Sequence, residues 1–507
     1  MILNRENLGK LPAPEKVILP PTNVWELPEK VLQFGTGVLL RGLPDYFIDK
    51  ANRQGIFNGR IVVVKSTDKG GTAEFDDQNN LYTLCVRGIA DGQKTEENII
   101  CSAISRVLAA QTHWPAILEV ATSPELQIII SNTTEVGIQL TQDSVTAQPP
   151  VSFPGKLLAI LFARYQAFNG DPQKGLVVVP TELITENGTK LRDIVTELAR
   201  QNNLEEDFLN WLTQHNTFCN TLVDRIVPGK PESAIVAGLQ QELGYQDELL
   251  TMSEVYRLWA ISGNEHVREV LSFAQADEGV VIAPDITIYR ELKLRLLNGT
   301  HTLSCAVAFL AGQETVKEAM GEPAVADFIS RVQEEIAPAI PYTVAPAEAT
   351  AFSQKVLDRF RNPHLDHRWL SITLNYTAKL KLRVVPVIEN YFTRFKQVPE
   401  NIALGFAAYL LFMKGTITEA GKYYGFLNSE KYLINDEAAG YYYDLWQQNK
   451  AEQVVEKALQ NLDLWGMNLD ALPGFTQAVQ KYLNKMLTDG MWPTITLLAS
   501  NNKIGLN

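Results

Sequence analysis

The first half of this chain alternates short β-branched runs with amphipathic segments, and few folds accommodate that alternation. The runs that we expect to be strands are Val31–Phe34, Ile61–Val64, Leu126–Ile130 and Leu176–Val179. Between them, apolar residues follow helical spacing, as in Leu43–Asn52 and Phe153–Phe168. Continuous β-branched runs joined by helices are typical of a parallel sheet that is buried on both faces. The sequence therefore predicts a doubly wound α/β domain.

The pattern changes after the strand candidate Val280–Ala283. From about Asp285 the apolar spacing is helical almost throughout, as in Ile402–Met413. We therefore predict two domains: residues 1–284 with the sheet, and residues 285–507 with a mainly α-helical architecture. The length of 507 residues supports the division, because single hydrophobic cores stop growing beyond about 300 residues.

Composition limits the partners and the compartment. A formal net charge of −13 disfavours binding to the phosphate backbone of nucleic acid, although a local basic cluster can still bind a small anion. The four cysteines are scattered without a C-x-x-C pair, so we expect buried free thiols rather than disulfides or structural zinc. The apolar runs are too short to span a bilayer, and the start MILNRENLGK lacks the apolar stretch of a secretory signal. We expect a cytoplasmic protein with a small-molecule substrate, and the oligomeric state is left open.

A glycine turn follows the first strand candidate and precedes a helical pattern. Glycines at such a point let backbone N–H groups approach a pyrophosphate at the positive end of a helix, which favours a dinucleotide cofactor. Leu40 stands where G-x-G-x-x-G would have its third glycine, so a plain tight turn is the alternative. The residues of this segment that we expect at the cofactor are Phe34, Gly35, Thr36, Gly37, Val38, Leu39 and Arg41.

An acidic residue after the second strand is the next expectation, because its carboxylate would accept hydrogen bonds from the adenosine ribose. Asp68 is the candidate, and a carboxylate there would repel the 2′-phosphate of NADP and favour NAD. Its separation from Gly37 exceeds the usual spacing of about 20 residues, and Lys65 and Lys69 would attract the 2′-phosphate. An aspartate that caps a turn is an equal alternative.

The segment Ile288–His301 has the pattern of a helix that carries Lys293, Asn298 and His301. At about 100° per residue, Asn298 lies about 140° from Lys293, and His301 lies between them. A lysine with a lowered pKa can exchange a proton with an alcohol near neutral pH. An asparagine amide can donate to an oxygen that gains negative charge, and a histidine can orient a hydroxyl. A solvated helix face is the alternative.

Several separated segments together resemble the polyol-specific long-chain dehydrogenases, the mannitol dehydrogenase family. They are Glu182–Gly188 ending in N-G, Phe218–Pro228 around V-D-R-I, Lys293–His301 as K-x(4)-N-x(2)-H, and Arg359–Pro363 as R-F-x-N-P. With the glycine turn and Lys379 they follow the order of that family over most of the chain. The resemblance implies a Rossmann-like domain followed by a helical substrate domain, with NAD as cofactor and metal-independent chemistry.

The resemblance also implies roles for individual residues. Lys293 would be the general acid/base, Asn187 and Asn298 the amide pair at the substrate oxygen, and His301 a residue that orients the substrate. Asn132 and Thr133 would belong to the cofactor site.

Within the family, Ser131–Ile138 and Leu296–Thr302 most resemble the branch that interconverts D-tagaturonate and D-altronate with NAD(H). Fructuronate or another sugar acid is the alternative substrate.

The region after Phe352 is locally basic within an acidic chain because it contains Arg359, Arg361, Arg368, Lys379 and Lys381. A uronate carboxylate would find partners there. The candidate substrate-binding residues are Arg361, Arg368 and Lys379, together with Glu135. Lys379 falls where the family often has D-G-S-x-K, but Asn375 and Tyr376 replace the Asp-Gly pair, so the role of this loop is open. A solvated basic face is the alternative.

Two rival functions remain. A zinc alcohol dehydrogenase needs clustered Cys and His ligands, and the pair His364 and His367 lacks a third ligand at a recognisable spacing. A non-catalytic NAD-binding sensor is the rival from another class. We predict a metal-free, NAD-dependent oxidoreductase that acts on a sugar acid.

Overall fold

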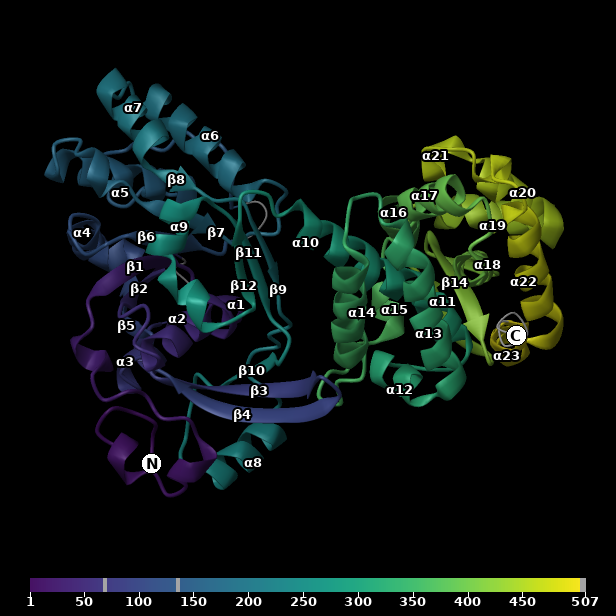
Figure 1. Ribbon diagram of the computed structural model, residues 1–507, viewed down its shortest axis with the longest axis horizontal. Helices are drawn as coiled ribbons and strands as arrows, with labels where there is room; N and C mark the ends of the chain where they lie inside the picture. The colour runs from purple at the N-terminus through teal and green to yellow at the C-terminus, as the bar shows by residue number, and fades with distance from the viewer. Residues whose placement is uncertain (67–70, 134–136, 502–507) are drawn as a thin grey trace. The chain divides into compact units, whose positions relative to one another are not determined.

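In a computed structural model, which describes residues 1–66, 71–133 and 137–501, the chain forms two compact units (Figure 1). The first unit comprises Met1–Gly88 and Lys94–Ile286. The second comprises Ile89–Gln93 and Thr287–Asn507. Two of the predicted site residues, Asp68 and Glu135, lie outside the described residues.

A six-stranded sheet forms the centre of the first unit, and every neighbouring pair of its strands is parallel. The strands are β1 (Glu29–Phe34), β2 (Arg60–Lys65), β5 (Ile104–Ala109), β6 (Ile128–Ser131), β7 (Val177–Pro180) and β8 (Thr217–Phe218). Their spatial order is β5-β2-β1-β6-β7-β8, which is the Rossmann order 3-2-1-4-5-6 with its reversal between β1 and β6. The predicted doubly wound domain is confirmed.

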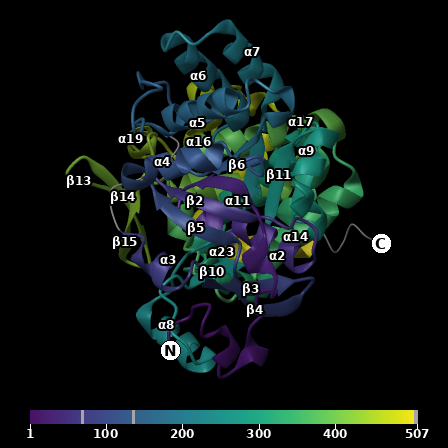
Figure 2. The ribbon, with the colours of Figure 1, turned by 90° about the vertical axis from the view of Figure 1, so that its left-hand side faces the viewer.

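Both faces of this sheet are buried, which explains why its strands read as continuous apolar runs. In β1, Val31 joins the core on one face, whereas Leu32 and Phe34 join the core on the other. The helices on the face of Leu32 lie together on one side of the sheet in two views (Figures 1 and 2): α4 (Ala110–Ala121), α5 (Phe153–Ala167), α6 (Asn187–Gln201) and α7 (Glu206–His215).

The opposite face is covered by α1 (Val38–Gly42) and α2 (Pro44–Arg53) together with two small sheets. One small sheet has the order β10-β3-β4, with β10 (Thr251–Glu254), β3 (Tyr82–Ala90) and β4 (Gln93–Cys101). The other has the order β12-β11-β9, with β12 (Val280–Ala283), β11 (Leu258–Ser262) and β9 (Thr221–Asp224). The remaining helices of this unit are α3 (Ala73–Asp77), α8 (Ser233–Leu243) and α9 (Glu265–Val270).

The second unit is mainly helical, as predicted. Its helices before the small sheet are α10 (Thr287–Leu292), α11 (Thr300–Leu310), α12 (Val316–Gly321), α13 (Pro323–Ile336), α14 (Pro346–Phe360), α15 (Trp369–Ile372), α16 (Tyr376–Arg383), α17 (Val385–Phe395) and α18 (Glu400–Phe412). Those after it are α19 (Ala439–Gln448), α20 (Ala451–Gln460), α21 (Leu462–Trp465), α22 (Phe475–Asp489) and α23 (Met491–Asn501). Helix α18 is buried nearly all round.

A three-stranded antiparallel sheet in the second unit was not predicted. Its strands are β13 (Ile417–Glu419), β14 (Lys422–Leu427) and β15 (Glu430–Ile434). Most residues of these strands are partly or fully exposed, so no buried apolar run marks them in the sequence. Across the part of the chain that is described, no helix has the length and apolar character of a membrane span. All four cysteines are buried and free, as their spacing predicted.

Asp45, in the first turn of α2, is a fully buried acid. Neither of its carboxyl oxygens meets a hydrogen-bond partner within the described residues. Burial raises the pKa of the Asp45 carboxyl to about 8, and the nearby Gln33 and Arg41 offset part of that rise. The folded protein therefore holds Asp45 protonated at neutral pH.

We predict that Asp45→Asn stabilises the fold increasingly as the pH rises from about 4 to about 8. An unfolded aspartate ionises near pH 4, whereas the folded one keeps its proton to about pH 8. Each pH unit in that window therefore lowers the free energy of unfolding by about 1.4 kcal/mol. Asparagine cannot ionise, and its N–H can donate to the unpartnered Oε1 of Gln33.

Denaturant unfolding of both proteins at about pH 5 and about pH 8 measures this effect. A stability difference that is the same at both pH values would contradict a protonated Asp45. Asp49→Asn is the matched control on the same helix. The Asp49 carboxylate accepts hydrogen bonds from Ser102 and Arg53, so its replacement should destabilise the protein.

Candidate active site

The predicted lysine segment lies in the second unit, and it is not a regular α-helix. Between α10 and α11 the residues Lys293–Gly299 form a π-helical turn, η6. In a π-helix the backbone hydrogen bonds close from residue i to residue i+5, so residues five apart lie one above the other. Lys293 and Asn298 therefore share a helix face, and the predicted separation of about 140° is wrong. Turns of this kind are rare and frequently occur at functional sites.

Side chains of the second unit hold this turn in place. Thr302 Oγ1 donates to the carbonyl of Asn298 (2.7 Å), and Arg383 Nη1 donates to Thr302 Oγ1 (3.0 Å). Arg295, inside the turn, donates through Nη1 to the carbonyl of Arg383 (3.1 Å) at the end of α16. The widened turn is thus tied to α16 at two points. Lys293 and Asn298 are both half-buried, so their side chains reach the surface of the unit.

His301 lies among aromatic rings at the start of α11. Its ring stacks on Phe360 with the centroids 4.1 Å apart. The rings of His367 and Trp369 stand perpendicular to it at 5.2 Å and 6.0 Å. The Nε2 atom of His301 is shielded from solvent and makes no hydrogen bond to any described residue. The ring orientation is therefore set by packing, and Nε2 is buried without a hydrogen-bond partner among the described residues.

Basic side chains surround His301. Burial, followed by the charges of His367, Arg359, Arg383 and Lys379, holds the pKa of His301 well below its usual value. Burial and Arg383 lower the pKa of Lys379, and burial and Arg359 lower the pKa of His367. His301 is therefore neutral at physiological pH, within a positive local field that would attract an anion.

The predicted substrate-binding residues separate into two groups. Lys379 joins the cluster around His301 and donates to the carbonyl of Ile372 (2.9 Å). Arg368 instead forms an exposed ion pair with Glu314 (3.1 Å), with 70% of its side chain exposed. Arg361, also largely exposed, pairs with Asp358 (3.6 Å).

Sequence analysis placed Arg359 in the basic region after Phe352, but it placed neither Arg383 nor His367 at this site. Two local signals pointed toward the arginines. Arg359 opens the R-F-x-N-P segment, and Arg383 follows Lys379 by one helical turn. Within the described residues no group of three or more His, Cys, Asp or Glu side chains could hold a metal ion, and His367 belongs to the aromatic cluster.

The glycine turn of the first unit lies at the carboxyl end of β1, beside the reversal of strand order. Gly35 has a φ of 128°, and a Cβ there would lie 2.8 Å from Leu40 Cδ1 and 3.2 Å from the carbonyl of Asn132. Glycine is therefore required at this position by the backbone itself. A Cβ at Gly37 would meet open space, so Gly37 borders room for a ligand at the start of α1.

G-x-G-x-x-G would have its third glycine at position 40, where helix and strand pack closely. Here Leu40 and Gly42 each meet part of that packing requirement. Leu40 is fully buried, and its Cδ1 atom fills the space beside Gly35. A Cβ on Gly42 would lie 2.8 Å from both methyl groups of Val227, so the close approach occurs two residues later. Arg41, which we expected at the cofactor, turns into the protein and donates through Nη1 to the carbonyl of Leu249 (2.5 Å).

A buried carboxylate, Glu182, fixes the loop after β6. Thr133 donates to Glu182 Oε1 through its backbone N (2.8 Å), and Ser131 Oγ donates to Oε2 (3.2 Å). The backbone N of Asn132 donates to the carbonyl of Phe34 (3.1 Å), which holds this loop beside the glycine turn. Burial raises the pKa of Glu182. Sequence analysis did not assign this role to Glu182.

Asn187 is fully buried at the start of α6, and its amide is committed within the first unit. Nδ2 donates to the carbonyls of Pro180 (3.1 Å) and Glu182 (3.0 Å) and to Thr221 Oγ1 (3.1 Å). Oδ1 accepts from the backbone N of Thr221 (2.9 Å) and of Gly188 (2.9 Å). This arrangement joins the ends of β7 and β9, and it leaves no amide hydrogen for the predicted donation to a substrate oxygen.

Comparison with known proteins gives a consistent result. The Mannitol dehydrogenase Rossmann domain matches residues 29–274, and the Mannitol dehydrogenase C-terminal domain matches residues 285–487. The altronate oxidoreductase of Halalkalibacterium halodurans is 37% identical over 494 residues, which is 95% of each chain. The altronate oxidoreductase of Bacillus subtilis is 38% identical over 471 residues, 92% of this chain and 94% of that one.

Two solved structures have a similar fold. The ternary complex of Pseudomonas fluorescens mannitol 2-dehydrogenase with NAD and D-mannitol has a TM-score of 0.66 at 23% identity and covers 99% of this chain and 100% of that one. A D-sorbitol dehydrogenase in substrate-free form has a TM-score of 0.77 at 20% identity, with 98% and 100% coverage. At these identities the likeness concerns the fold alone.

Proposed function

This chain belongs to the mannitol dehydrogenase family, and on that premise we propose that it is an NAD-dependent oxidoreductase that interconverts D-tagaturonate and D-altronate. The observation that carries the proposal is the π-turn that holds Lys293 and Asn298 five residues apart, in the segment that leads directly into His301 and its basic cluster. Relatives that share more than a third of their residues over nearly the whole chain are altronate oxidoreductases, which supports a sugar acid as substrate.

The residues of the glycine turn fit a dinucleotide. The turn at Gly35–Gly37 lies at the carboxyl end of β1 beside the reversal of strand order, where ligands bind in open α/β sheets. The open space in front of Gly37 has room for a pyrophosphate, and the loop Asn132–Thr133 lies alongside. We propose that these segments hold NAD and that Asp68 accepts hydrogen bonds from its ribose. Bound NADH would supply the hydride for reduction of the keto group.

Lys293 and Asn298 would serve the oxygen of that keto group. During reduction, Lys293 as an ammonium gives a proton to the oxygen while it gains negative charge. Asn298, one π-turn away, donates a hydrogen bond to the same oxygen. In the reverse direction neutral Lys293 takes the proton of the alcohol. We assign Asn187 to holding the ends of β7 and β9, since its amide hydrogens already have acceptors.

The basic cluster would bind the carboxylate of the sugar acid. Arg359, Arg383 and Lys379 supply positive charge around neutral His301, and a carboxylate would offset the repulsion among them. A substrate hydroxyl would supply the hydrogen-bond partner that the buried Nε2 of His301 lacks among the described residues. This assignment replaces the predicted carboxylate partners Arg361 and Arg368, which form ion pairs at the surface.

Lys293→Ala should lower kcat by about 10²- to 10⁴-fold, because it removes the proton donor. The substitution leaves the glycine turn of the first unit intact. The equilibrium Kd for NADH, measured by fluorescence titration, should not change. Lys457→Ala is the control and should keep full turnover, because the ammonium of this exposed lysine donates to Asn449 Oδ1 in the second unit. Near-normal turnover by Lys293→Ala would refute the proposed acid/base.

Lys379→Met should raise the KM for the keto-uronate about tenfold, a loss of about 1.4 kcal/mol of binding, because it removes one charge of the basic cluster. The matched control is Lys381→Met on the same helix, where the exposed ammonium donates to the carbonyl of Asp463. Steady-state kinetics of both variants measure the difference. Equal effects from the two variants would place the carboxylate elsewhere.

The substrate itself is tested by mixing the protein with NADH and either D-tagaturonate or D-fructuronate, and following the loss of NADH absorbance. We expect the higher kcat/KM with D-tagaturonate. Faster turnover of D-fructuronate would identify the alternative reductase of the same family. NADH binding without turnover of either compound would instead favour a non-catalytic sensor.

A further inference from the structure

The helix that begins at the glycine turn is broken after five residues. Helix α1 ends at Gly42, Leu43 leaves helical conformation with a φ of −133°, and Pro44 opens α2. Proline has no N–H, and the break leaves the last carbonyls of α1 without helical partners. The carbonyl of Gly42 needs another donor, because Gly42 and most of α2 are buried.

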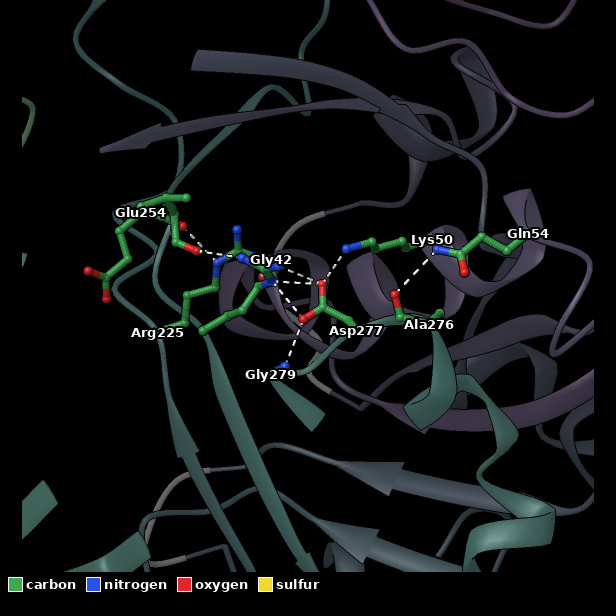
Figure 3. A network of polar contacts seen from close by, with 10 residues as sticks. Gly42, Lys50, Gln54, Arg225, Glu254, Ala276, Asp277 and Gly279 are labelled. Atoms are coloured by element: carbon green, nitrogen blue, oxygen red, sulfur yellow. Dashed lines mark hydrogen bonds and ion pairs between the residues drawn. The ribbon is translucent and has the colours of Figure 1, made fainter. Parts of the chain in front are cut away.

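Arg225 of the V-D-R-I segment supplies one of these donors. Its Nη1 donates to the carbonyl of Gly42 (2.5 Å), and its Nε donates to the carbonyl of Glu254 (2.9 Å). The guanidinium also lies 4.5 Å from the ring centroid of Tyr46 in α2. Figure 3 shows Arg225 between Gly42 and Glu254. One buried side chain thus contacts the end of α1 and the first turns of α2.

A second arginine anchors α2 from the same side. Arg257 lies 5.6 Å from the ring centroid of Tyr46 and donates through Nε to both oxygens of Asp277 (3.0 and 2.8 Å). Asp277 also accepts from Lys50 Nζ of α2 (2.7 Å), as Figure 3 shows. Helix α2 is therefore fixed without Arg225. At the end of α1, Tyr82 Oη donates to the carbonyl of Arg41 (2.7 Å), and Arg225 is the donor to the next carbonyl, that of Gly42.

The backbone around Arg225 is itself held firmly. The backbone N of Ile226 donates to Glu254 Oε1 (2.6 Å), and the backbone N of Glu254 donates to the carbonyl of Ile226 (2.9 Å). Two residues after Arg225, the methyl groups of Val227 would lie 2.8 Å from a Cβ on Gly42. The segment Arg225–Val227 therefore fits the helix break by a hydrogen bond and by close packing.

We infer that Arg225 is a positioning residue for the cofactor turn: it fixes the direction of α1 and thereby the direction of the backbone N–H groups at Gly35–Gly37. A helix of five residues has no stability of its own, so contacts at its two ends set its direction. One end is the glycine turn, and the other holds the carbonyls of Arg41 and Gly42, of which Arg225 binds the last. The inference rests on the proposed function, because it takes NAD to bind at this turn.

Arginine suits this role better than lysine. Its planar fork donates in two directions at once, to Gly42 and to Glu254, while its face rests on Tyr46. A lysine ammonium could keep the positive charge, but its single nitrogen cannot reproduce both carbonyl bonds and the stacking. Although burial lowers the pKa of Arg225 to about 10, the side chain stays charged at neutral pH.

The test compares Arg225→Lys with the unaltered protein and with Arg164→Lys. Arg164 is an equally buried arginine of α5 that donates only to carbonyls, among them those of Lys174 and Leu126, on the other face of the sheet. We expect both variants to lower the thermal midpoint. Only Arg225→Lys should raise the Kd and KM for NADH, by about tenfold. The kcat at saturating NADH and the KM for the sugar acid should stay near wild type.

A wild-type Kd for NADH in Arg225→Lys would overturn the inference alone, because the residue would then serve stability only. Failure of the unaltered protein to bind NADH would overturn the proposed function, and the inference with it. These two failures are distinguishable because they occur in different proteins.

A second pair of variants keeps the test independent of whether Arg225→Lys folds. Gly42→Ala places a methyl group against Val227 and should weaken NADH binding by displacing the end of α1. Adding Val227→Ala removes the methyl groups that it meets and should restore most of the affinity. NADH affinity that is indifferent to both changes would show that the helix break does not control the cofactor turn.

Discussion

The positions of the cofactor turn and of the lysine segment depend on one constraint: where a buried helix is irregular, its backbone carbonyls need hydrogen-bond donors from side chains. Helix α1 ends after five residues, and the helix that carries Lys293 widens into a π-turn. Each irregularity displaces carbonyls from the ordinary i to i+4 ladder, and a buried helix end cannot leave them without donors. In the first unit Arg225 donates to Gly42, and in the second unit Thr302 donates to Asn298 and is itself bonded to Arg383. In both units an arginine from a distant part of the chain takes part, Arg225 in the first and Arg383 in the second.

Buried arginines therefore have two uses in this protein. Arg164 and Arg225 donate to carbonyl oxygens and hold loops and helix ends together. Arg359 and Arg383 lie in the positive cluster around His301, where burial and mutual repulsion act against the charged forms of neighbouring groups. Repulsion of this kind destabilises the unliganded protein, and an anion that binds there relieves it. A chain with a net charge of −13 can thus present a site that favours an anionic substrate.

The sequence predicts those features of the fold that depend on burial. Continuous apolar runs such as Ile61–Val64 revealed the parallel sheet because strands buried on both faces have little polar alternation. The strands β13–β15 were not predicted, because most of their residues are exposed and form no continuous apolar run. The π-turn could not be read from spacing, since its cause is a set of contacts to α16, more than 80 residues away. For the same reason Arg368 was expected at the substrate and Arg383 was not: local basic composition says nothing about which side chains turn inward.

The contacts that hold the π-turn also set the position of Lys293 relative to the basic cluster. Glycine is not the cause of the turn, because a Cβ on Gly299 would have only ordinary contacts, the nearest at 3.7 Å. The turn is instead held by Arg295 and Thr302, which bond to the end of α16. Lys379 lies on that same helix, one turn before Arg383. The elements that bring Lys293 and Asn298 onto one face are thus fastened to the helix that carries part of the basic cluster. The spacing between Lys293 and the basic cluster is therefore set by contacts within one unit. If the two have the roles that we propose, such a spacing can select a substrate by the distance between its keto carbon and its carboxylate.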